Sequence, residues 1–252
     1  MKILLDISFV GTAYCGYQVQ PSAPTIQQHL NVAARQLFGI DCDIVGCSRT
    51  DSGVHAKQFF ASVSEKGKEY IKTDIACDKI QNALNFYLPE DISVNHVSLV
   101  EDSFHPRYDV KSKEYLYCIW NSKTRNPFWK DRCWHYPRSI DESSFENMKK
   151  AAAQFVGTHD FAAYMSANSN VKSTVRTIYH ATVERDGNAI YFRVSADGFL
   201  YNMVRILTGT LISVAEGKID YSDIEKITLS RDRARAGLTA PSQGLYLNKV
   251  VY

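Results

Sequence analysis

The sequence predicts an α+β protein made of two ferredoxin-like units, each a split β-α-β arrangement with an antiparallel sheet. The first observation behind this is the element order of the first half, which runs strand, helix, strand, strand, helix, strand. The second is that the later half partly repeats that order. The third is the length of 252 residues, enough for one large domain or two of ordinary size. We therefore expect units over 1–103 and 104–252, with sheets facing a central cleft that is the natural place for a catalytic site.

The first unit is expected to contain four strands and two helices. Thr25 caps the first helix, because Gln28 stands three residues after it and apolar residues recur at helical spacing beyond the cap. The second helix carries Ile75, Ile80 and Leu84 on one apolar stripe. The predicted strands cover 3–10, 41–46, 54–63 and 92–99, and the second helix covers 73–86.

The second unit is expected to begin near Phe104 and to repeat part of the element order of the first. A hairpin is predicted across Asp186-Gly187-Asn188, since alternating strand-like runs flank that turn. A largely apolar helix over 201–216 stops at Gly217. The other predicted elements are strands over 113–121, 132–136, 174–185, 189–196 and 245–251 and helices over 141–155 and 219–229.

Composition restricts the function classes. The net charge is only +2, so any surface that binds nucleic acid must be local, for example the clusters from Lys123 to Arg132 and from Arg231 to Arg235. Six cysteines contain no Cys-x-x-Cys pair and seven histidines form no ligand pattern, which favours a reduced cytoplasm and no metal site. No apolar run has the length of a membrane span, so we expect no membrane association.

The segment from Gly46 to Ala56 is where the chemistry is expected. Asp51 stands at a turn between two strand-like runs, and Ser52-Gly53 supplies the small residue and the free φ that such a turn needs. Arg49 lies two residues earlier, on the same face of an extended backbone, so its guanidinium could keep the carboxylate ionised. The alternative is an ordinary Asx turn, in which the aspartate only bonds its own backbone.

This segment resembles the signature of the TruA-type tRNA pseudouridine synthases, whose Arg-Thr-Asp-x-Gly-Val-His contains the catalytic aspartate. Further stretches are similar, in order along nearly all of the chain, to other motifs of the family: residues 14–20 to Tyr-x-Gly-Trp-Gln-x-Gln, residues 104–107, with proline at 106, to Phe-His-Ala-Arg, residues 113–117 to Lys-x-Tyr-x-Tyr, and residues 199–205 to Phe-x-x-x-Met-Val-Arg. The chain departs from the family at Tyr17, which replaces tryptophan, at Cys47-Ser48, which replace alanine and glycine, and at Ile206, which replaces asparagine.

The resemblance implies a tRNA pseudouridine(38–40) synthase, an isomerase that converts uridine to pseudouridine in the anticodon stem-loop of tRNA. It also implies a homodimer in the cytoplasm that binds tRNA and needs no cofactor. The reaction breaks the N1 to C1′ bond, turns the uracil and joins C5 to C1′, which requires a carboxylate at the sugar and an aromatic platform for an extruded base. Asp51 would act at C1′ or C2′, Tyr115 would stack on the base, and Arg49 would lie near it.

Four of the candidate residues carry alternatives of their own. Arg205 stands among apolar residues, so it is either buried and paired with a carboxylate, for which Asp51 is our choice, or placed on the wet face of its helix. His105 and Arg107 are candidates for phosphate contact, and a solvated bend is the alternative. Tyr115 could instead be a half-buried strand tyrosine.

Two other function classes stay open from the residues alone. A ferredoxin-like RNA-binding module without catalysis would explain the element order. The strand over 57–63 lacks the glycine of the usual RNA-binding motif, however. A carboxylate-based nucleoside hydrolase would use a pair of acids, whereas this turn offers one carboxylate beside an arginine.

Overall fold

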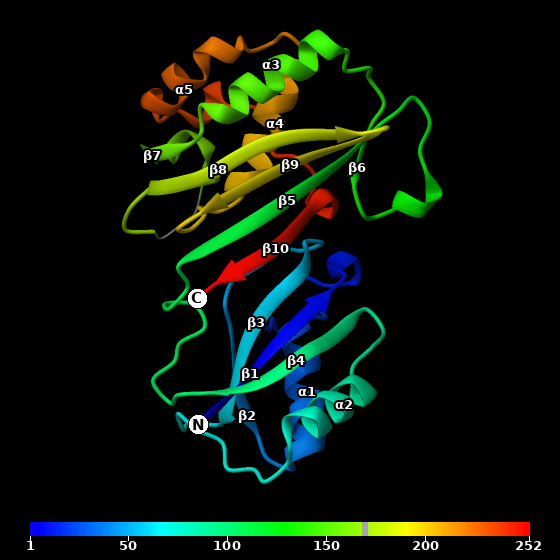
Figure 1. The fold of residues 1–252 in the computed structure, drawn as a ribbon, viewed down its shortest axis with the longest axis vertical. Helices are drawn as coiled ribbons and strands as arrows, with labels where there is room; N and C mark the ends of the chain where they lie inside the picture. Colours follow the sequence, from blue (N-terminus) through cyan, green and yellow to red (C-terminus); the bar gives the residue numbers. More distant parts are fainter. Residues whose placement is uncertain (168–170) are drawn as a thin grey trace. The chain divides into compact units, whose positions relative to one another are not determined.

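Antiparallel strands and helices alternate in the computed structural model, which describes residues 1–167 and 171–252 and is of the mixed α+β class (Figure 1). The chain divides into two units, Met1–Lys111 with Tyr246–Tyr252 and Ser112–Leu245. The sequence places the boundary at 103/104, and the structure places it after Lys111. The C-terminal residues belong to the first unit because the last strand pairs with a strand of that unit, Tyr246 opposite His55 and Leu247 opposite Ala56.

The first unit follows the predicted element order. Its central strand β1 (Lys2–Phe9) pairs antiparallel with β3 (His55–Glu65) and β4 (Ile92–Val100). The strand β2 (Cys42–Gly46) pairs antiparallel with β3, and β10 (Leu245–Val251) pairs parallel with it. Helices α1 (Ile26–Phe38) and α2 (Cys77–Tyr87) pack against each other, and each packs against a strand of this sheet.

The two helices show where local signals succeed and where they fail. The Gln28 N–H donates to Thr25 Oγ1 (3.3 Å), so the predicted cap of α1 is confirmed. The α2 helix begins at Cys77, not near residue 73. The Thr73 hydroxyl accepts a hydrogen bond from the Ile75 N–H (3.1 Å), and such a local turn competes with helix formation. Ile75 is therefore 38% exposed and lies outside the helix, whereas Ile80 and Leu84 are buried as predicted.

The second unit contains the strand order β5-β9-β8-β7, with β6 parallel to β5. Asp186 lies opposite Ala189, which confirms the predicted hairpin. Strand β7 was not predicted, because its four residues Gly-Thr-His-Asp carry no apolar alternation. The elements of this unit are β5 (Ser112–Asn121), β6 (Trp134–Tyr136), α3 (Glu142–Ala153), β7 (Gly157–Asp160), β8 (Val175–Asp186), β9 (Ala189–Ala196), α4 (Met203–Ala215) and α5 (Ile224–Ser230).

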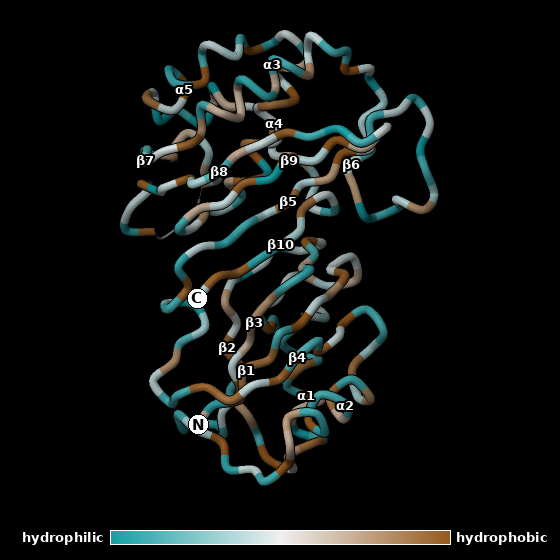
Figure 2. Tube along the Cα trace, viewed as in Figure 1, coloured by the Kyte–Doolittle hydropathy of each residue, from teal (hydrophilic) through white to brown (hydrophobic). Residues whose placement is uncertain are grey.

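Each unit has an apolar core between its strands and helices. In the first unit the largest buried side chains include Ile7, Leu30 and Phe59, and in the second they include Phe155 and Phe192. In Figure 2 the loop between β5 and β6 is mostly hydrophilic. No helix among residues 1–167 and 171–252 combines the length and apolarity needed to cross a membrane.

Candidate active site

Asp51 is half-buried at a tight turn between β2 and β3. The Val54 N–H donates to the Asp51 carbonyl (3.2 Å), which closes the turn through the main chain. Gly53 has φ +77°, a left-handed conformation that glycine adopts without the steric cost that a Cβ imposes. The turn chemistry predicted for Ser52-Gly53 is therefore present, and it places Asp51 at the entrance to the turn.

The loop that precedes α1 holds this turn in place. The Tyr14 carbonyl accepts the Gly53 N–H (3.2 Å) and the Ser52 hydroxyl (3.3 Å). Tyr14 is itself fixed, because its hydroxyl donates to Asp91 Oδ1 (2.5 Å). The Tyr17 N–H donates to the Thr50 carbonyl (3.2 Å) immediately before Asp51. Two residues of the first family motif thus support the backbone on both sides of the aspartate.

Tyr17, which stands where the family usually has tryptophan, has a structural role. It is 2% exposed and stacks on Phe59 with 4.4 Å between ring centroids. Burial raises the pKa of its hydroxyl well above the ordinary value, so the phenol stays neutral. Tyr17 therefore supports the core of the first unit.

Arg49 is exposed at the start of the same segment. Within the part of the chain that the structure describes, no ion pair joins its guanidinium to Asp51. The two residues therefore share a loop, and Arg49 faces solvent. This position leaves its five N–H donors accessible to a nucleic acid.

His105 and Arg107 lie in the segment after β4. His105 Nδ1 accepts hydrogen bonds from the N–H groups of Arg107 (3.1 Å) and Tyr108 (3.3 Å), and its ring stacks on Tyr108 with 4.2 Å between centroids. Because Nδ1 accepts, the protonated nitrogen of the neutral ring is Nε2. Arg107 is half-buried, with its Nε shielded from solvent. The His105 side chain thus helps to shape this bend, whereas Arg107 contributes its backbone N–H.

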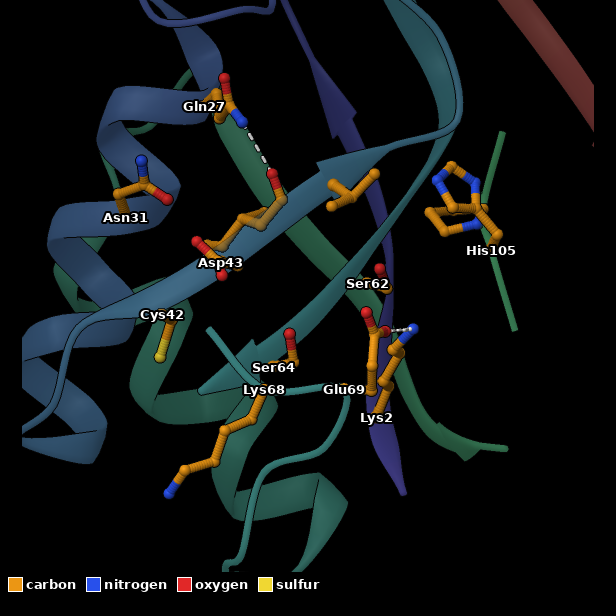
Figure 3. Close-up of a pocket in the computed structure, with 13 residues that line it drawn as sticks. Lys2, Gln27, Asn31, Cys42, Asp43, Ser62, Ser64, Lys68, Glu69 and His105 are labelled. Atoms are coloured by element: carbon orange, nitrogen blue, oxygen red, sulfur yellow. Dashed lines mark hydrogen bonds and ion pairs between the residues drawn. The ribbon is translucent and has the colours of Figure 1, made fainter. Parts of the chain in front are cut away.

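A polar pocket of about 360 Å³ lies in the first unit beside His105 (Figure 3). Gln27 points from α1 toward β2, where its amide nitrogen donates to the Ile44 carbonyl (2.7 Å), and Lys2 pairs with Glu69 (2.5 Å). No residue of the 47–54 segment lines this pocket. It is therefore separate from the surroundings of Asp51.

Tyr115 lies on β5 of the second unit, opposite Val194 of β9. It is 8% exposed, and its ring packs edge-to-face against Phe199 with 5.0 Å between centroids. Such contact fixes the plane of the Tyr115 ring, which a platform for a base requires. The contact between Phe199 and Tyr115 joins two positions far apart in the sequence, so the motifs alone did not predict it.

Arg205 is half-buried near the start of α4, and two hydrogen bonds fix its guanidinium. Its Nε donates to the Ala240 carbonyl and its Nη1 donates to Asn202 Oδ1, both at 2.7 Å. Asn202 has φ +59° and immediately precedes the helix. The turn over 199–202 therefore contacts both Tyr115 and Arg205. The contact with Ala240 could not be found from the sequence, because Ala240 lies 35 positions along the chain from Arg205.

Close backbone packing positions Ala240 beside α4. A Cβ at Gly209 would lie 2.8 Å from the Leu238 carbonyl carbon, and the Gly237 N–H donates to Thr210 Oγ1 (2.9 Å). The Ala240 N–H also donates to the Arg205 carbonyl (3.1 Å). The segment that holds the Arg205 guanidinium thus depends on a helical glycine.

Gly209→Ala is expected to destabilise the protein by about 1–3 kcal/mol, because the added methyl group overpacks this contact. Without this contact, replacing glycine by alanine inside a helix would stabilise the protein by about 1 kcal/mol. The sign of the change in the free energy of unfolding therefore tests the packing argument. Chemical denaturation measures the change. Gly198→Ala is the control, since a Cβ there meets only the Arg176 side chain at 3.4 Å or more. An equal loss in both variants, or a gain for Gly209→Ala, would contradict the packing argument.

Among the residues that the structure describes, no group of three or more His, Cys, Asp or Glu side chains lies in an arrangement that could hold a metal ion. The candidate side chains are divided between the units. Asp51, Arg49, His105 and Arg107 belong to the first, and Tyr115 and Arg205 belong to the second.

A family model described as tRNA pseudouridine synthase matches residues 7–109 and 151–252, which is most of the chain. The chain belongs to the tRNA pseudouridine synthase family. The first matched segment contains the Asp51 turn, His105 and Arg107, and the second contains Arg205. Tyr115 lies between the two matched segments.

Relatives named tRNA pseudouridine synthase A align over the full length. The protein from Thermoanaerobacter sp. (strain X514) is 43% identical over 253 residues, covering 100% of this chain and 99% of its own. The protein from Acetivibrio thermocellus is 42% identical over 251 residues with the same coverage. Among solved structures, a Cbf5-Nop10-Gar1 complex matches with a TM-score of 0.34 and 13% identity over 98% of this chain and 58% of that chain, too low for a comparison of folds.

Proposed function

We propose that this chain isomerises uridine to pseudouridine in tRNA, at positions 38–40 of the anticodon stem-loop. The observation that carries the proposal is the Asp51 turn, which holds the family signature in a chain that matches tRNA pseudouridine synthases along most of its length. The reaction rearranges bonds within one nucleotide, so it needs neither a redox partner nor a group donor. A single aimed carboxylate and a base platform are sufficient parts.

Each proposed role matches the environment of its side chain. Asp51 attacks C1′ or removes the proton from C2′, and the fixed turn aims it. Tyr115 stacks on the extruded uracil, because its ring is held edge-on by Phe199. Arg49 faces solvent and occupies space near the base. Arg205, whose guanidinium is oriented by Asn202 and Ala240, pairs with Asp51 and keeps it ionised.

The proposal extends to the setting of the site. His105 and Arg107 contact phosphates of the bound tRNA. The enzyme acts as a homodimer in the cytoplasm, and its partner subunit helps to carry the tRNA, which spreads contact over two modestly charged chains.

Tritium release from tRNA labelled at C5 of uridine tests the proposal. C5 loses its hydrogen when it forms the bond to C1′. A synthase therefore releases tritium to water and leaves the RNA backbone intact. Free uracil without tritium release would instead indicate a nucleoside hydrolase. Tight binding of tRNA with neither product would indicate a binding module.

The two basic clusters of the sequence differ in whether their side chains are already bonded within the protein. Arg231 pairs with Asp160 (2.9 Å), and Arg233 donates to the Gly237 carbonyl (2.8 Å) and to Thr239 Oγ1 (3.2 Å). The side chains of Arg231 and Arg233 are thus already engaged in contacts within the protein. Lys123 and Arg125 are exposed, and within residues 1–167 and 171–252 neither forms an ion pair.

Replacing Lys123, Arg125 and Lys130 together with glutamine is expected to lower the slope of log Kd against log salt for tRNA by about 2, since each phosphate contact contributes roughly 0.7–0.9. Arg231→Gln is the matched control and should leave the slope unchanged, because its charge is already paired. Fluorescence anisotropy over a salt series measures both. An unchanged slope in the triple variant would show that the cluster is a solvated surface.

A further inference from the structure

The loop over 122–133, between β5 and β6, projects from its own sheet (Figure 1) and is internally braced. The Trp120 indole N–H donates to the Thr124 carbonyl (3.1 Å), and Trp120 stacks on Trp129 with 6.2 Å between centroids. Asn126 Oδ1 accepts the Phe128 N–H (3.1 Å), which starts a short 3-10 helix over Pro127–Trp129. The Cys133 thiol donates to the Trp129 carbonyl (3.4 Å).

This bracing turns one aromatic ring inward and its neighbour outward. Trp129 packs on Trp120, whereas Phe128 is 93% exposed. Among the exposed large apolar side chains of the described residues, Phe128 has the highest exposed fraction. A ring held outward on a hydrogen-bonded turn loses little conformational freedom when it binds a partner.

Three basic residues lie on the same loop as the Phe128 ring. Lys123 and Arg125 flank Thr124, which is bonded to Trp120, and Lys130 follows Trp129, which is stacked on Trp120. Both parts of the loop therefore meet at the same tryptophan pair, next to Phe128. All three basic side chains are exposed, and none forms an ion pair with a described residue. In Figure 2 the loop is largely hydrophilic.

We infer that the loop over 122–133 is a tRNA-binding surface on which Phe128 stacks on an unpaired base while Lys123, Arg125 and Lys130 bind the flanking phosphates. The inference rests on the proposed function, because it takes tRNA as the substrate. Aromatic rings interleaved with cations are the arrangement that binds single-stranded nucleotides without hydrogen bonds to base edges.

A second copy of this chain fits the surface less well. A symmetric dimer whose two-fold axis passes through this loop places the loop against itself, so the basic residues of one copy would face those of the other. Like charges brought together in this way oppose association. A polyanion, in contrast, neutralises them and leaves the ring to contact a base.

Binding of an unmodified tRNA transcript to the full chain tests the inference. Phe128→Ala is expected to raise Kd about 5- to 150-fold, the range for losing one base stack. Phe128→Leu should weaken binding similarly, whereas Phe128→Trp, which keeps a ring, should retain affinity. Phe86→Ala is the matched control, since Phe86 is 82% exposed but lies on α2 of the other unit.

Several outcomes would overturn the inference. Full affinity in Phe128→Ala would show that no base stacks there, and full affinity in Phe128→Leu would show an apolar contact instead of a stack. An equal loss in Phe86→Ala would show that the effect is not specific to the loop. If sedimentation shows that Phe128→Ala dissociates a dimer, the loop is a subunit contact.

Tritium release by the wild-type protein, measured in parallel, separates this inference from the proposed function. Release by the wild type with unchanged Kd in Phe128→Ala overturns the inference alone. No release by the wild type, with Kd raised in Phe128→Ala, overturns the isomerase proposal and supports the loop as an RNA surface.

Discussion

Asp51→Ala is expected to reduce turnover by about 10⁴-fold or more while tRNA binding and folding are retained. Removal of a residue that forms a covalent bond or moves a proton has an effect of this size. The turn itself should survive, because the Val54 N–H still donates to the main-chain carbonyl of residue 51 and the Gly53 N–H still donates to the Tyr14 carbonyl. Single-turnover assays with excess enzyme measure the chemical step.

Ser52→Ala is the control for damage to the turn. It removes a hydroxyl that donates to the Tyr14 carbonyl (3.3 Å) and should cost about 1 kcal/mol of stability with little effect on the chemical step. If Asp51→Ala turned over like the wild type, or lost no more activity than Ser52→Ala, Asp51 would be an ordinary turn residue.

Tyr115 is expected to show the second large effect, and two variants separate its ring from its hydroxyl. Tyr115→Leu removes the ring and should lose roughly 1–3 kcal/mol of base stacking. Tyr115→Phe keeps the ring against Phe199 but removes the hydroxyl. We expect Tyr115→Phe to cleave the glycosidic bond but not to remove the proton from C5. The reason is that the missing hydroxyl is the group to which we assign the role of the base.

Tyr117→Phe is the control for the Tyr115 variants. Tyr117 lies two residues along the same strand, and its hydroxyl donates to the Pro241 carbonyl (2.6 Å). Its loss should lower stability by about 1 kcal/mol and leave turnover in place. Complete C5 proton release by Tyr115→Phe would remove the hydroxyl from the mechanism. Normal turnover by Tyr115→Leu would remove the residue from the site.

Local signals in the sequence predicted the parts of the fold that depend on near neighbours. The Thr25 cap, the hairpin at Gly187 and the turn at Gly53 each use residues within a few positions of one another. The predicted start of α2 was wrong because the Thr73 hydroxyl accepts a hydrogen bond from the Ile75 N–H ahead of the helix. Strand β7 was missed because its short polar sequence has no alternation, and only pairing with β8 makes it a strand.

The sequence predicted which residues form the candidate site better than it predicted the contacts that position them. The signature identified Asp51 and Arg49, but the support from Tyr14 and Tyr17 depends on a loop folding back against the turn. Arg205 was expected among apolar residues, yet its contact with Ala240 joins positions far apart in sequence. The cluster from Arg231 to Arg235 suggested phosphate binding, whereas Arg231 and Arg233 mainly bond to the protein itself.

The position of pseudouridine in tRNA tests the central claim most directly. A tRNA transcript with uridine at 38, 39 and 40 would be incubated with the wild-type protein and, separately, with Asp51→Asn. Pseudouridine-specific modification and primer extension would then locate the product. We expect pseudouridine at these positions with the wild type and none with Asp51→Asn, although both proteins bind the transcript. The absence of pseudouridine from a transcript that the wild type binds, or its formation by Asp51→Asn, would contradict the account.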